Sequence, residues 1–267
     1  MRKTKELMDL KDRVAIVTGG AGHIGSTICD TCAEHGARVV IIDFNKEACD
    51  ERCEAISQEY GTDAFPIVMD LTDEKKLRKV PDKVLKKFGS IDILVNSAML
   101  IEREPLKGWC VDFVDQNSGT WRRELEINLT VPFILAQVCT NALVESHHGS
   151  VINISSIYGI CGPDLRLYEG TEMGNSAAYA ASKGGLVQLT RWMATVLAPR
   201  VRVNAITLGG VERGQPESFH TRYVYKTPMQ RMATEEDVKG AALFLASDLS
   251  AYVTGHNLVV DGGFSTW

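Results

Sequence analysis

Tyr179 and Lys183 are the two residues of this sequence whose types and spacing most directly suggest chemistry. They stand four residues apart in Tyr179-Ala-Ala-Ser-Lys183, so a helix would place both side chains on one face, about one turn apart. A free tyrosine, with a pKa near ~10, is a poor base at neutral pH, but an adjacent cation stabilises its phenolate. The pair could therefore exchange a proton with an alcohol. Because Tyr and Lys at helical spacing are usually a core residue and its solvated neighbour, the hypothesis depends on the rest of the chain.

A glycine-rich stretch near the start of the chain has the pattern of a phosphate-binding loop. Gly19, Gly22 and Gly25 follow a β-branched run and open an amphipathic stretch, where backbone amides and the helix dipole can hold a pyrophosphate. Eighteen residues past Gly25, Asp43 ends the next β-branched run, and its carboxylate would accept hydrogen bonds from the hydroxyls of an adenosine ribose. The same charge would repel a 2′-phosphate, and Phe44 follows where NADP would require an arginine. The predicted cofactor is therefore NAD, with NADP the less favoured alternative.

Short β-branched runs alternate with longer amphipathic stretches along the chain, which is typical of a parallel sheet with helical crossovers. The predicted strands are 13–18, 38–43, 65–70, 91–96, 150–155, 201–206 and 257–261. The predicted helices are 24–35, 46–59, 73–88, 121–145, 177–197 and 234–247. We predict an α/β fold with a single domain over 1–267, in which residues 1–12 are an N-terminal extension. It is a doubly wound parallel sheet of about seven strands with helices on both faces.

Two long connections break this rhythm. Residues 100–119 and 160–176 each follow the carboxyl end of a predicted strand and have no clear periodicity. Loops of this length in a compact domain tend to be functional, and the carboxyl edge of an open α/β sheet is where ligands bind. We therefore expect the binding site at this edge.

Composition narrows the classes of partner. The 267 residues carry a net charge of −5 with acids and bases interspersed, which excludes a basic nucleic-acid-binding face. The first 13 residues are charged and no apolar run follows them, so we expect neither a secretory signal nor a membrane span, and a cytoplasmic protein. Seven cysteines are an odd number, and Cys29, Cys32, Cys49 and Cys53 lie in predicted helices, which favours reduced thiols as apolar filler. A four-thiolate zinc site is the alternative, but no metal is expected.

With the glycine loop, Asp43 and the Tyr179/Lys183 pair, the chain resembles the short-chain dehydrogenase/reductase family over residues 10–264, in its short type. That family has the Rossmann arrangement. Further matches are Asp70, Asn96-Ser97-Ala98, Asn128 in Ile-Asn-Leu-Thr, Ser155-Ser156, and the tail Val260-Asp261-Gly262-Gly263.

The resemblance implies a catalytic tetrad of Asn128, Ser156, Tyr179 and Lys183. Tyr179 would be the general base in oxidation and the acid in reduction, and Lys183 would lower its pKa and bind the nicotinamide ribose. Ser156 would hold the substrate oxygen, and Asn128 would anchor a water that relays the proton. Hydride would pass directly between substrate and nicotinamide, without a metal. The implied cofactor contacts are Gly19, Gly22, His23, Ile24, Asp43, Phe44, Asp70, Leu71, Asn96, Ser97, Ala98, Tyr179, Lys183, Gly209 and Val211.

The chain departs from the family pattern at several cofactor positions. His23 replaces a glycine of T-G-x-x-x-G-x-G, and it would either reach the pyrophosphate or face solvent at the helix start. The resulting G-x-x-G-x-x-G spacing is similar to that of the extended branch, but we expect the short type, without the extra substrate domain of that branch. Met99 follows Asn96-Ser97-Ala98 where glycine is usual, and Leu208 replaces the proline before Gly209. Glu212-Arg213 occupy the neighbourhood of a threonine that contacts the nicotinamide amide, so backbone groups near Val211 would serve instead.

The predicted substrate loops are 160–176 and 210–232. Ser156 and Tyr179 are 23 residues apart, about ten more than in many members of the family. Charged and polar side chains occupy both loops: Asp164, Arg166, Tyr168, Glu169 and Glu172 in the first, and Arg213, His220, Arg222 and Lys226 in the second. They favour a polar or anionic substrate, and surface solvation is the alternative. The segments 168–171 and 215–217 resemble a subgroup linked to flagellin glycan and nonulosonate pathways.

The resulting hypothesis is an NAD-dependent oxidoreductase acting on a secondary alcohol or carbonyl of a small polar metabolite, such as a sugar derivative. A 3-oxoacyl thioester reductase is the alternative within the enzyme class, and Asp43 argues against the NADPH that it would prefer. A non-catalytic NAD-binding sensor is the alternative of another class, and the intact Tyr179/Lys183 pair argues against it. The family resemblance also implies a homo-oligomer, a tetramer or dimer, that packs helices 121–145 and 177–197.

Overall fold

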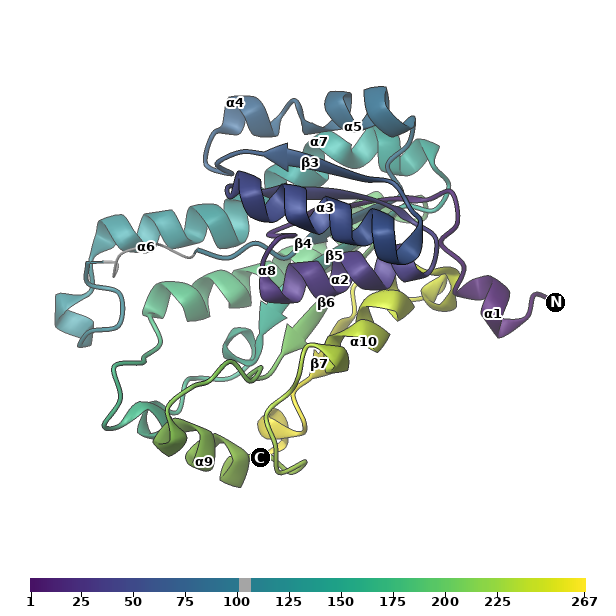
Figure 1. Ribbon diagram of the computed structural model, residues 1–267. Coiled ribbons are helices and arrows are strands. Elements are labelled where there is room, and N and C mark those ends of the chain that lie inside the picture. The colour runs from purple at the N-terminus through teal and green to yellow at the C-terminus, as the bar shows by residue number, and fades with distance from the viewer. Residues whose placement is uncertain (101–106) are drawn as a thin grey trace.

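The computed structural model describes residues 1–100 and 107–267, which form one parallel sheet with helices on both faces (Figure 1). The strand order is β3-β2-β1-β4-β5-β6-β7, and every neighbouring pair is parallel. The strands are β1 Val14–Thr18, β2 Arg38–Asp43, β3 Ala64–Val68, β4 Ile93–Asn96, β5 Ser150–Ser156, β6 Arg202–Leu208 and β7 Asn257–Val260. The predicted doubly wound fold is confirmed. The order reverses between β1 and β4, and this reversal creates a crevice at the carboxyl ends of the strands.

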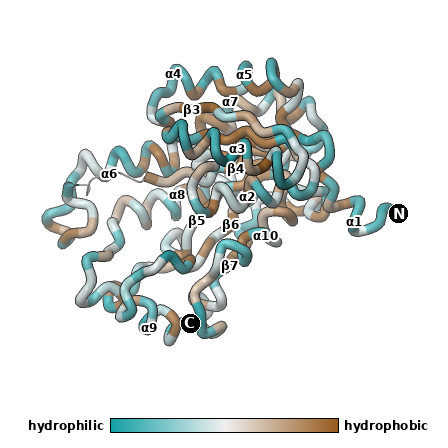
Figure 2. The backbone as a smooth tube through the Cα atoms, in the orientation of Figure 1, coloured by the Kyte–Doolittle hydropathy of each residue, from teal (hydrophilic) through white to brown (hydrophobic). Residues whose placement is uncertain are grey.

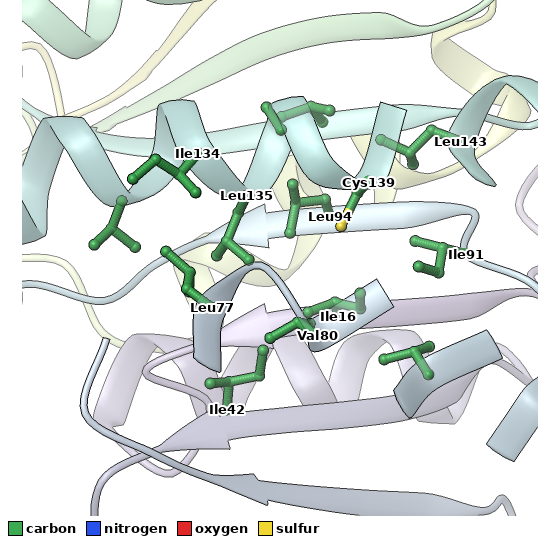
Figure 3. Packing of buried hydrophobic residues seen from close by; sticks show 14 of the residues in the cluster. Ile16, Ile42, Leu77, Val80, Ile91, Leu94, Ile134, Leu135, Cys139 and Leu143 are labelled. Atoms are coloured by element: carbon green, nitrogen blue, oxygen red, sulfur yellow. The ribbon is translucent and has the colours of Figure 1, made fainter. Parts of the chain in front are cut away.

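The helices divide between the two faces of the sheet. They are α1 Thr4–Leu7, α2 His23–Glu34, α3 Lys46–Tyr60, α4 Glu74–Leu77, α5 Val80–Phe88, α6 Ser118–Leu125, α7 Val131–Glu145, α8 Ala177–Leu197, α9 Glu217–Lys226 and α10 Glu236–Ala246. Side chains alternate between faces along each strand, so Ile16 packs with α5, α7 and α8 while Val17 packs with α2, α3 and α10. Figure 3 shows the first of these cores, in which Leu94 lies against Leu135 and Cys139 of α7. In Figure 2, apolar residues (brown) gather in the central strands, whereas polar residues (teal) recur along the helices that flank them.

A π turn, Glu126–Thr130, lies where the sequence predicts one continuous helix over 121–145. It separates α6 from α7, and Pro132 in the first turn of α7 has no N–H to continue the ladder. The predicted helix 73–88 is likewise divided into α4 and α5, with Pro81 in the first turn of α5. The sequence pattern did not reveal where either helix is divided. Proline is tolerated in the first turn of a helix, so Pro81 and Pro132 did not by themselves indicate an interruption.

The loops contain more regular structure than the sequence predicts. A 3-10 turn, Leu165–Tyr168, lies inside 160–176, and α9 occupies the middle of 210–232. Part of the connection 100–119 lies outside the described residues, and α6 begins at Ser118 within it. The N-terminal extension docks on the body through Arg2, whose Nη1 lies 2.6 Å from Asp248 Oδ2.

In the described residues, one helical run is long and apolar enough to cross a membrane by length and composition alone. This run, Ser118–Glu145, covers α6, the π turn and α7, and 56% of its most apolar window is buried inside the protein. Core helices pass the same test, and α7 contributes Ile134, Leu135 and Leu143 to the core in Figure 3. Burial therefore explains its apolar character.

Candidate active site

A cleft with a volume of about 920 Å³ opens at the carboxyl ends of the strands, as the sequence predicts. Its inner wall is formed by segments that follow β1, β2, β3, β4, β5 and β6, and its outer wall by the loops around α9 and by residues near the start of α8. Most of the residues proposed from the sequence line it: Gly19, Gly22, His23, Ile24, Asp43, Phe44, Asp70, Leu71, Ser97, Ala98, Ser156, Tyr179, Lys183, Gly209 and Val211.

The glycine loop is built so that only backbone occupies its turn. Gly19 has φ +64°, and a Cβ there would lie 2.9 Å from the Cα of Ala98. A Cβ on Gly25 would collide with the carbonyl group of Gly19. Gly22 is the N-cap of α2 and offers no side-chain cap, so the amides of the first turn are available to an anion. This cradle fits a pyrophosphate.

His23 lies at the rim of this loop. Its side chain is 66% exposed, and its Nδ1 is 3.6 Å from Glu235 Oε1. Of the two possibilities left open by the sequence, this placement agrees better with a solvent-facing residue at the helix start.

Asp43 ends β2 with its carboxylate at the edge of the cleft. Its Oδ1 accepts hydrogen bonds from the amides of Phe44 (2.8 Å) and Asn45 (3.3 Å), which fixes the direction of the group. Phe44 is 57% exposed and lines the cleft beside it. Asp70 lies two residues beyond β3, where its Oδ1 accepts from the amide and hydroxyl of Thr72. A carboxylate and an apolar ring thus meet where an adenosine would lie.

Asn96 is the exception among the predicted cofactor contacts. It is 2% exposed, its Nδ2 donates to Asn153 Oδ1 at 2.8 Å, and it does not line the cleft. The side chain therefore connects β4 to β5 inside the sheet, and this placement argues against a side-chain contact with the cofactor. Thr18, which the sequence analysis missed, fixes the next two residues: its Oγ1 accepts from the amides of Ser97 and Ala98, both at 3.1 Å.

The structure brings the four tetrad positions together at the junction of β5, α8 and the π turn. Tyr179 and Lys183 lie on α8, and Lys183 Nζ is 5.8 Å from the centre of the Tyr179 ring. Ser156, at the end of β5, lies beside the Tyr179 phenol and favours its phenolate form. Neighbouring Ser155 instead donates to the carbonyl of Lys183 at 3.1 Å. Of the two serines, Ser156 is the one that faces the reacting groups.

Asn128 lies in the π turn and is 1% exposed. Its Nδ2 donates to Ser182 Oγ at 3.1 Å, and its Oδ1 accepts from the Leu100 amide at 3.2 Å. Lys183 Nζ donates to the carbonyl of Ile154 at 2.9 Å. The residues are thus fixed from both sides by α8 and the ends of β4 and β5.

The ionisation of the pair differs from the sequence expectation. Burial raises the pKa of the Tyr179 phenol, although the bond from Ser156 and the charge of Arg213 oppose this change. Burial also lowers the pKa of Lys183 to about 8, with the nearby Glu124 carboxylate acting in the opposite direction. Lys183 was expected to make Tyr179 acidic, but burial outweighs such an effect here. A pKa of about 8 means that Lys183 titrates close to physiological pH.

The segment after β6 forms part of the cleft wall. Gly209 and Val211 line the cleft, and the Gly210 amide donates to the hydroxyl of Tyr223 on α9. The carbonyl of Val211 accepts from Gln215 Nε2 at 2.7 Å. Arg213 follows and lines the cleft, and its positive charge favours the phenolate form of Tyr179.

The two substrate loops contact each other directly. Lys226 Nζ on α9 lies 3.0 Å from Asp164 Oδ2, and Arg222 Nη1 donates to the carbonyl of Glu169 at 2.6 Å. A small outer core lies beneath these contacts and consists of Ile157, Tyr158, Leu167, Phe219, Tyr223, Met232 and Phe264. The charged residues of the loops therefore serve partly to hold the loops together.

Several cleft residues escaped the sequence analysis. Arg123 and Trp109 line the outer cleft, and so does Asn175, whose buried Oδ1 has no hydrogen-bond partner among the described residues. Glu124 is 1% exposed behind the tetrad. One feature of the sequence could have indicated Glu124: it stands four residues before Asn128, and residues i and i+4 lie on the same face of a helix.

Comparison with known proteins identifies the family. The family model described as "Enoyl-(Acyl carrier protein) reductase" matches residues 19–265. A curated 3-oxoacyl-[acyl-carrier-protein] reductase FabG from Thermotoga maritima is 33% identical over 96% of this chain and 99% of its own. A structure of NAD+-bound xylitol dehydrogenase has a TM-score of 0.84 at 29% identity, covering 95% of this chain and 99% of its own. A gluconate 5-dehydrogenase from Burkholderia cenocepacia, in complex with NADP and tartrate, has a TM-score of 0.83 at 29% identity, covering 99% and 100%.

The chain belongs to the short-chain dehydrogenase/reductase family, as its motifs predict, and it is an NAD(P)-dependent oxidoreductase. The glycine cradle and the strand-end carboxylate fit the dinucleotide that this class uses. Family membership favours an enzyme over the non-catalytic sensor.

Proposed function

We propose that the protein is an NAD-dependent dehydrogenase or reductase that interconverts a secondary alcohol and a carbonyl on a small polar metabolite, such as a sugar derivative. The observation that carries the proposal is the meeting of Ser156, Tyr179 and Lys183 at the base of a cleft whose other end holds the glycine cradle and Asp43. One end fits a dinucleotide, and the other can exchange a proton with an alcohol.

The chemistry follows from the positions of these groups. The cofactor held by the glycine cradle and Asp43 would supply the hydride chemistry, as NAD+ in oxidation of the alcohol and as NADH in reduction of the carbonyl. Ser156 orients the substrate oxygen next to the Tyr179 phenol, which removes its proton during oxidation and returns it during reduction. Lys183, 5.8 Å from the centre of the ring, provides positive charge beside the phenol and would hold the nicotinamide ribose. Asn128 holds the π turn against Ser182, where it would anchor a water for proton relay.

The polar substrate is supported by the outer wall of the cleft. Arg123 and Arg213 bring two guanidinium groups to this wall, while Asn175 brings an amide whose Oδ1 has no hydrogen-bond partner among the described residues. Such groups recognise hydroxyl and carboxylate oxygens. The matched xylitol and gluconate dehydrogenases act, by their names, on a polyol and a sugar acid, which agrees with this lining.

NAD rather than NADP is supported by Asp43. Its carboxylate lies at the cleft edge with its direction fixed by two backbone amides, and Phe44 follows it. A 2′-phosphate at this point would meet a negative charge without a cation in the adjacent position. Both cofactors occur among the structural relatives, so this choice rests on the chain's own residues.

A 3-oxoacyl thioester reductase is the second candidate. Its support is the similarity to FabG and the apolar part of the cleft, where Met99, Trp109, Met173 and Phe219 lie. Comparing rates on acetoacetyl thioesters with NADPH against rates on sugars and sugar acids with NAD+ separates the two.

The test is the Tyr179→Phe variant, assayed with NAD+ against polyols, sugars and sugar acids. The change removes only the hydroxyl, so kcat/KM should fall about 10²- to 10⁴-fold while NADH affinity changes less than about two-fold. Tyr252→Phe is the matched control, because Tyr252 is fully exposed and should have no effect. Full activity in Tyr179→Phe would contradict the proposed base, and tight NADH binding without turnover on any substrate would contradict the proposed function.

We also propose a homo-oligomer. The support is a set of large apolar side chains left exposed on the helices expected to pack: Trp121, Phe133, Trp192 and Val196, between 39% and 56% exposed. Light scattering that shows only monomers at micromolar concentration would contradict it.

A further inference from the structure

Glu124 is a buried carboxylate with an unusual set of partners. It lies on α6 and is 1% exposed. Its Oε2 accepts two hydrogen bonds, from Trp109 Nε1 at 2.9 Å and from Ser176 Oγ at 2.7 Å. A carboxylate buried to this degree is costly unless it is paired or hydrogen-bonded, so its surroundings must compensate for the lost water.

Ser176 connects this carboxylate to the catalytic helix. It is the N-cap of α8, and its Oγ accepts from the Tyr179 amide at 2.9 Å while donating to Glu124. The carboxylate therefore lies at the N-terminus of a 21-residue helix, where the helix dipole favours negative charge. A second contact reaches α8 from the π turn that follows α6, since Asn128 donates to Ser182, whose Oγ donates to the Tyr179 carbonyl at 2.9 Å. The N–H of Tyr179 is thus linked through Ser176 to Glu124, and its carbonyl is linked through Ser182 to Asn128.

The ionisable groups that face Glu124 come from two other segments. Lys183 and Tyr179 face it from α8, and Cys110 faces it from the segment that carries Trp109; Arg123 is its neighbour on α6. The negative charge favours the ammonium form of Lys183 and disfavours the phenolate of Tyr179 and the thiolate of Cys110. Of the two cations in this group, Lys183 is the buried one, at 4% exposed, whereas Arg123 is exposed.

We propose that Glu124 is a positioning residue for the Tyr179–Lys183 pair: it holds the first turn of α8 through Ser176 and supplies the buried negative charge that keeps Lys183 an ammonium. Among the described residues, Glu124 is the charged group that offsets the burial of the Lys183 cation. This inference rests on the proposed role of Lys183 in binding the cofactor.

The experiment measures NADH affinity by fluorescence from about pH 6 to about pH 10, which requires no substrate. A lysine whose pKa is lowered to about 8 loses its charge as the pH rises through that value, so wild-type affinity should weaken above it. Glu124→Gln keeps an oxygen to accept from Trp109 and Ser176 but removes the charge. The Lys183 pKa then falls further. The pH above which NADH affinity weakens, called the break below, should therefore move to lower pH by about 0.5–1 unit. The alkaline decrease in kcat/KM for carbonyl reduction should move in the same direction, because reduction needs the neutral phenol and the ammonium.

Controls separate charge from structure. Glu126→Gln removes a partly buried carboxylate two residues away and should leave the break in place. Ser176→Ala keeps the charge but cuts the bond to Tyr179, so kcat for reduction should fall about three- to ten-fold with the break unmoved. Glu124→Met, a neutral side chain of similar size, should reproduce the shift if the glutamine variant does not fold.

A break that stays at the wild-type pH in the neutral Glu124 variants would overturn the inference, because a purely structural residue would change affinity without moving it. A break that survives in Lys183→Met would also overturn it, since the titrating group would not be Lys183. If NADH binds with the expected pH dependence and no carbonyl is reduced, the proposed function fails while the role of Glu124 stands.

Discussion

The inner and outer halves of the cleft are held by different forces. The inner half, which faces the dinucleotide, consists of strand ends anchored in two large apolar cores, where Ile16 and Val17 are fully buried. The outer half consists of loops held by one small core and by polar contacts such as Asp164–Lys226. Core packing is intolerant of small changes in volume, whereas exposed ion pairs contribute little individually. The cofactor half should therefore be rigid, and the substrate half should be adjustable without loss of the fold.

The largest effect that tests this contrast is expected from Gly25→Ala. A Cβ at this position would collide with the Gly19 carbonyl, so the loop must shift or the helix must move. We expect about 1–3 kcal/mol of destabilisation and NADH binding weakened at least ~10-fold. Thermal unfolding and fluorescence titration measure both quantities.

The matched substitution in the outer half is Gly162→Ala. A Cβ there meets nothing within 4 Å and φ is not in the left-handed region, so both stability and NADH affinity should be unchanged. If the two alanine variants behave alike, the proposed difference in rigidity between the halves is wrong.

The sequence predicted the inner half well for a physical reason. Buried strands, a glycine turn and a strand-end carboxylate are local patterns, so Gly19 to Gly25 and Asp43 could be placed without knowing the rest of the fold. Asn96 is the exception, since nothing local distinguishes a side chain that points to Asn153 from one that points to the cleft.

The outer half was predicted only as a pair of charged loops. Asp164 and Lys226 are 62 residues apart, and which of many loop charges meet depends on the tertiary structure. Glu124 was missed for a similar reason: it stands in Arg122-Arg123-Glu124-Leu125-Glu126, which looks like a solvated helix face, yet the tertiary fold buries it against α8. Charge patterns predict surfaces, and they do not reveal the carboxylate that a second helix covers.

An intermediate effect is expected from Asp43→Asn, which tests the selectivity of the inner half. The loss of a charged acceptor should weaken NADH binding about 10-fold and improve NADPH binding relative to NADH, because the repulsion of the 2′-phosphate disappears. Fluorescence titration with both cofactors gives the ratio. Glu47→Gln, an exposed charge on α3, is the control and should leave the ratio unchanged. An unchanged ratio in Asp43→Asn would remove the basis for preferring NAD.

The smallest effect is expected where the outer loops join, in Lys226→Met. Arg166 and then Lys226 hold the pKa of Asp164 below its usual range, so the carboxylate is ionised throughout the neutral range and the Lys226 contact persists there. Without the lysine, α9 should separate more easily from the loop 160–176, which raises KM about two- to five-fold with little change in kcat or unfolding temperature. High salt should raise the wild-type KM toward that of the variant, since partly exposed pairs are screened.

The control is Lys239→Met, which breaks an ion pair with Glu34 between α10 and α2 and should leave KM unchanged. A rise in KM for both variants, or a loss of stability confined to Lys226→Met, would show that the outer loops are part of the rigid body after all.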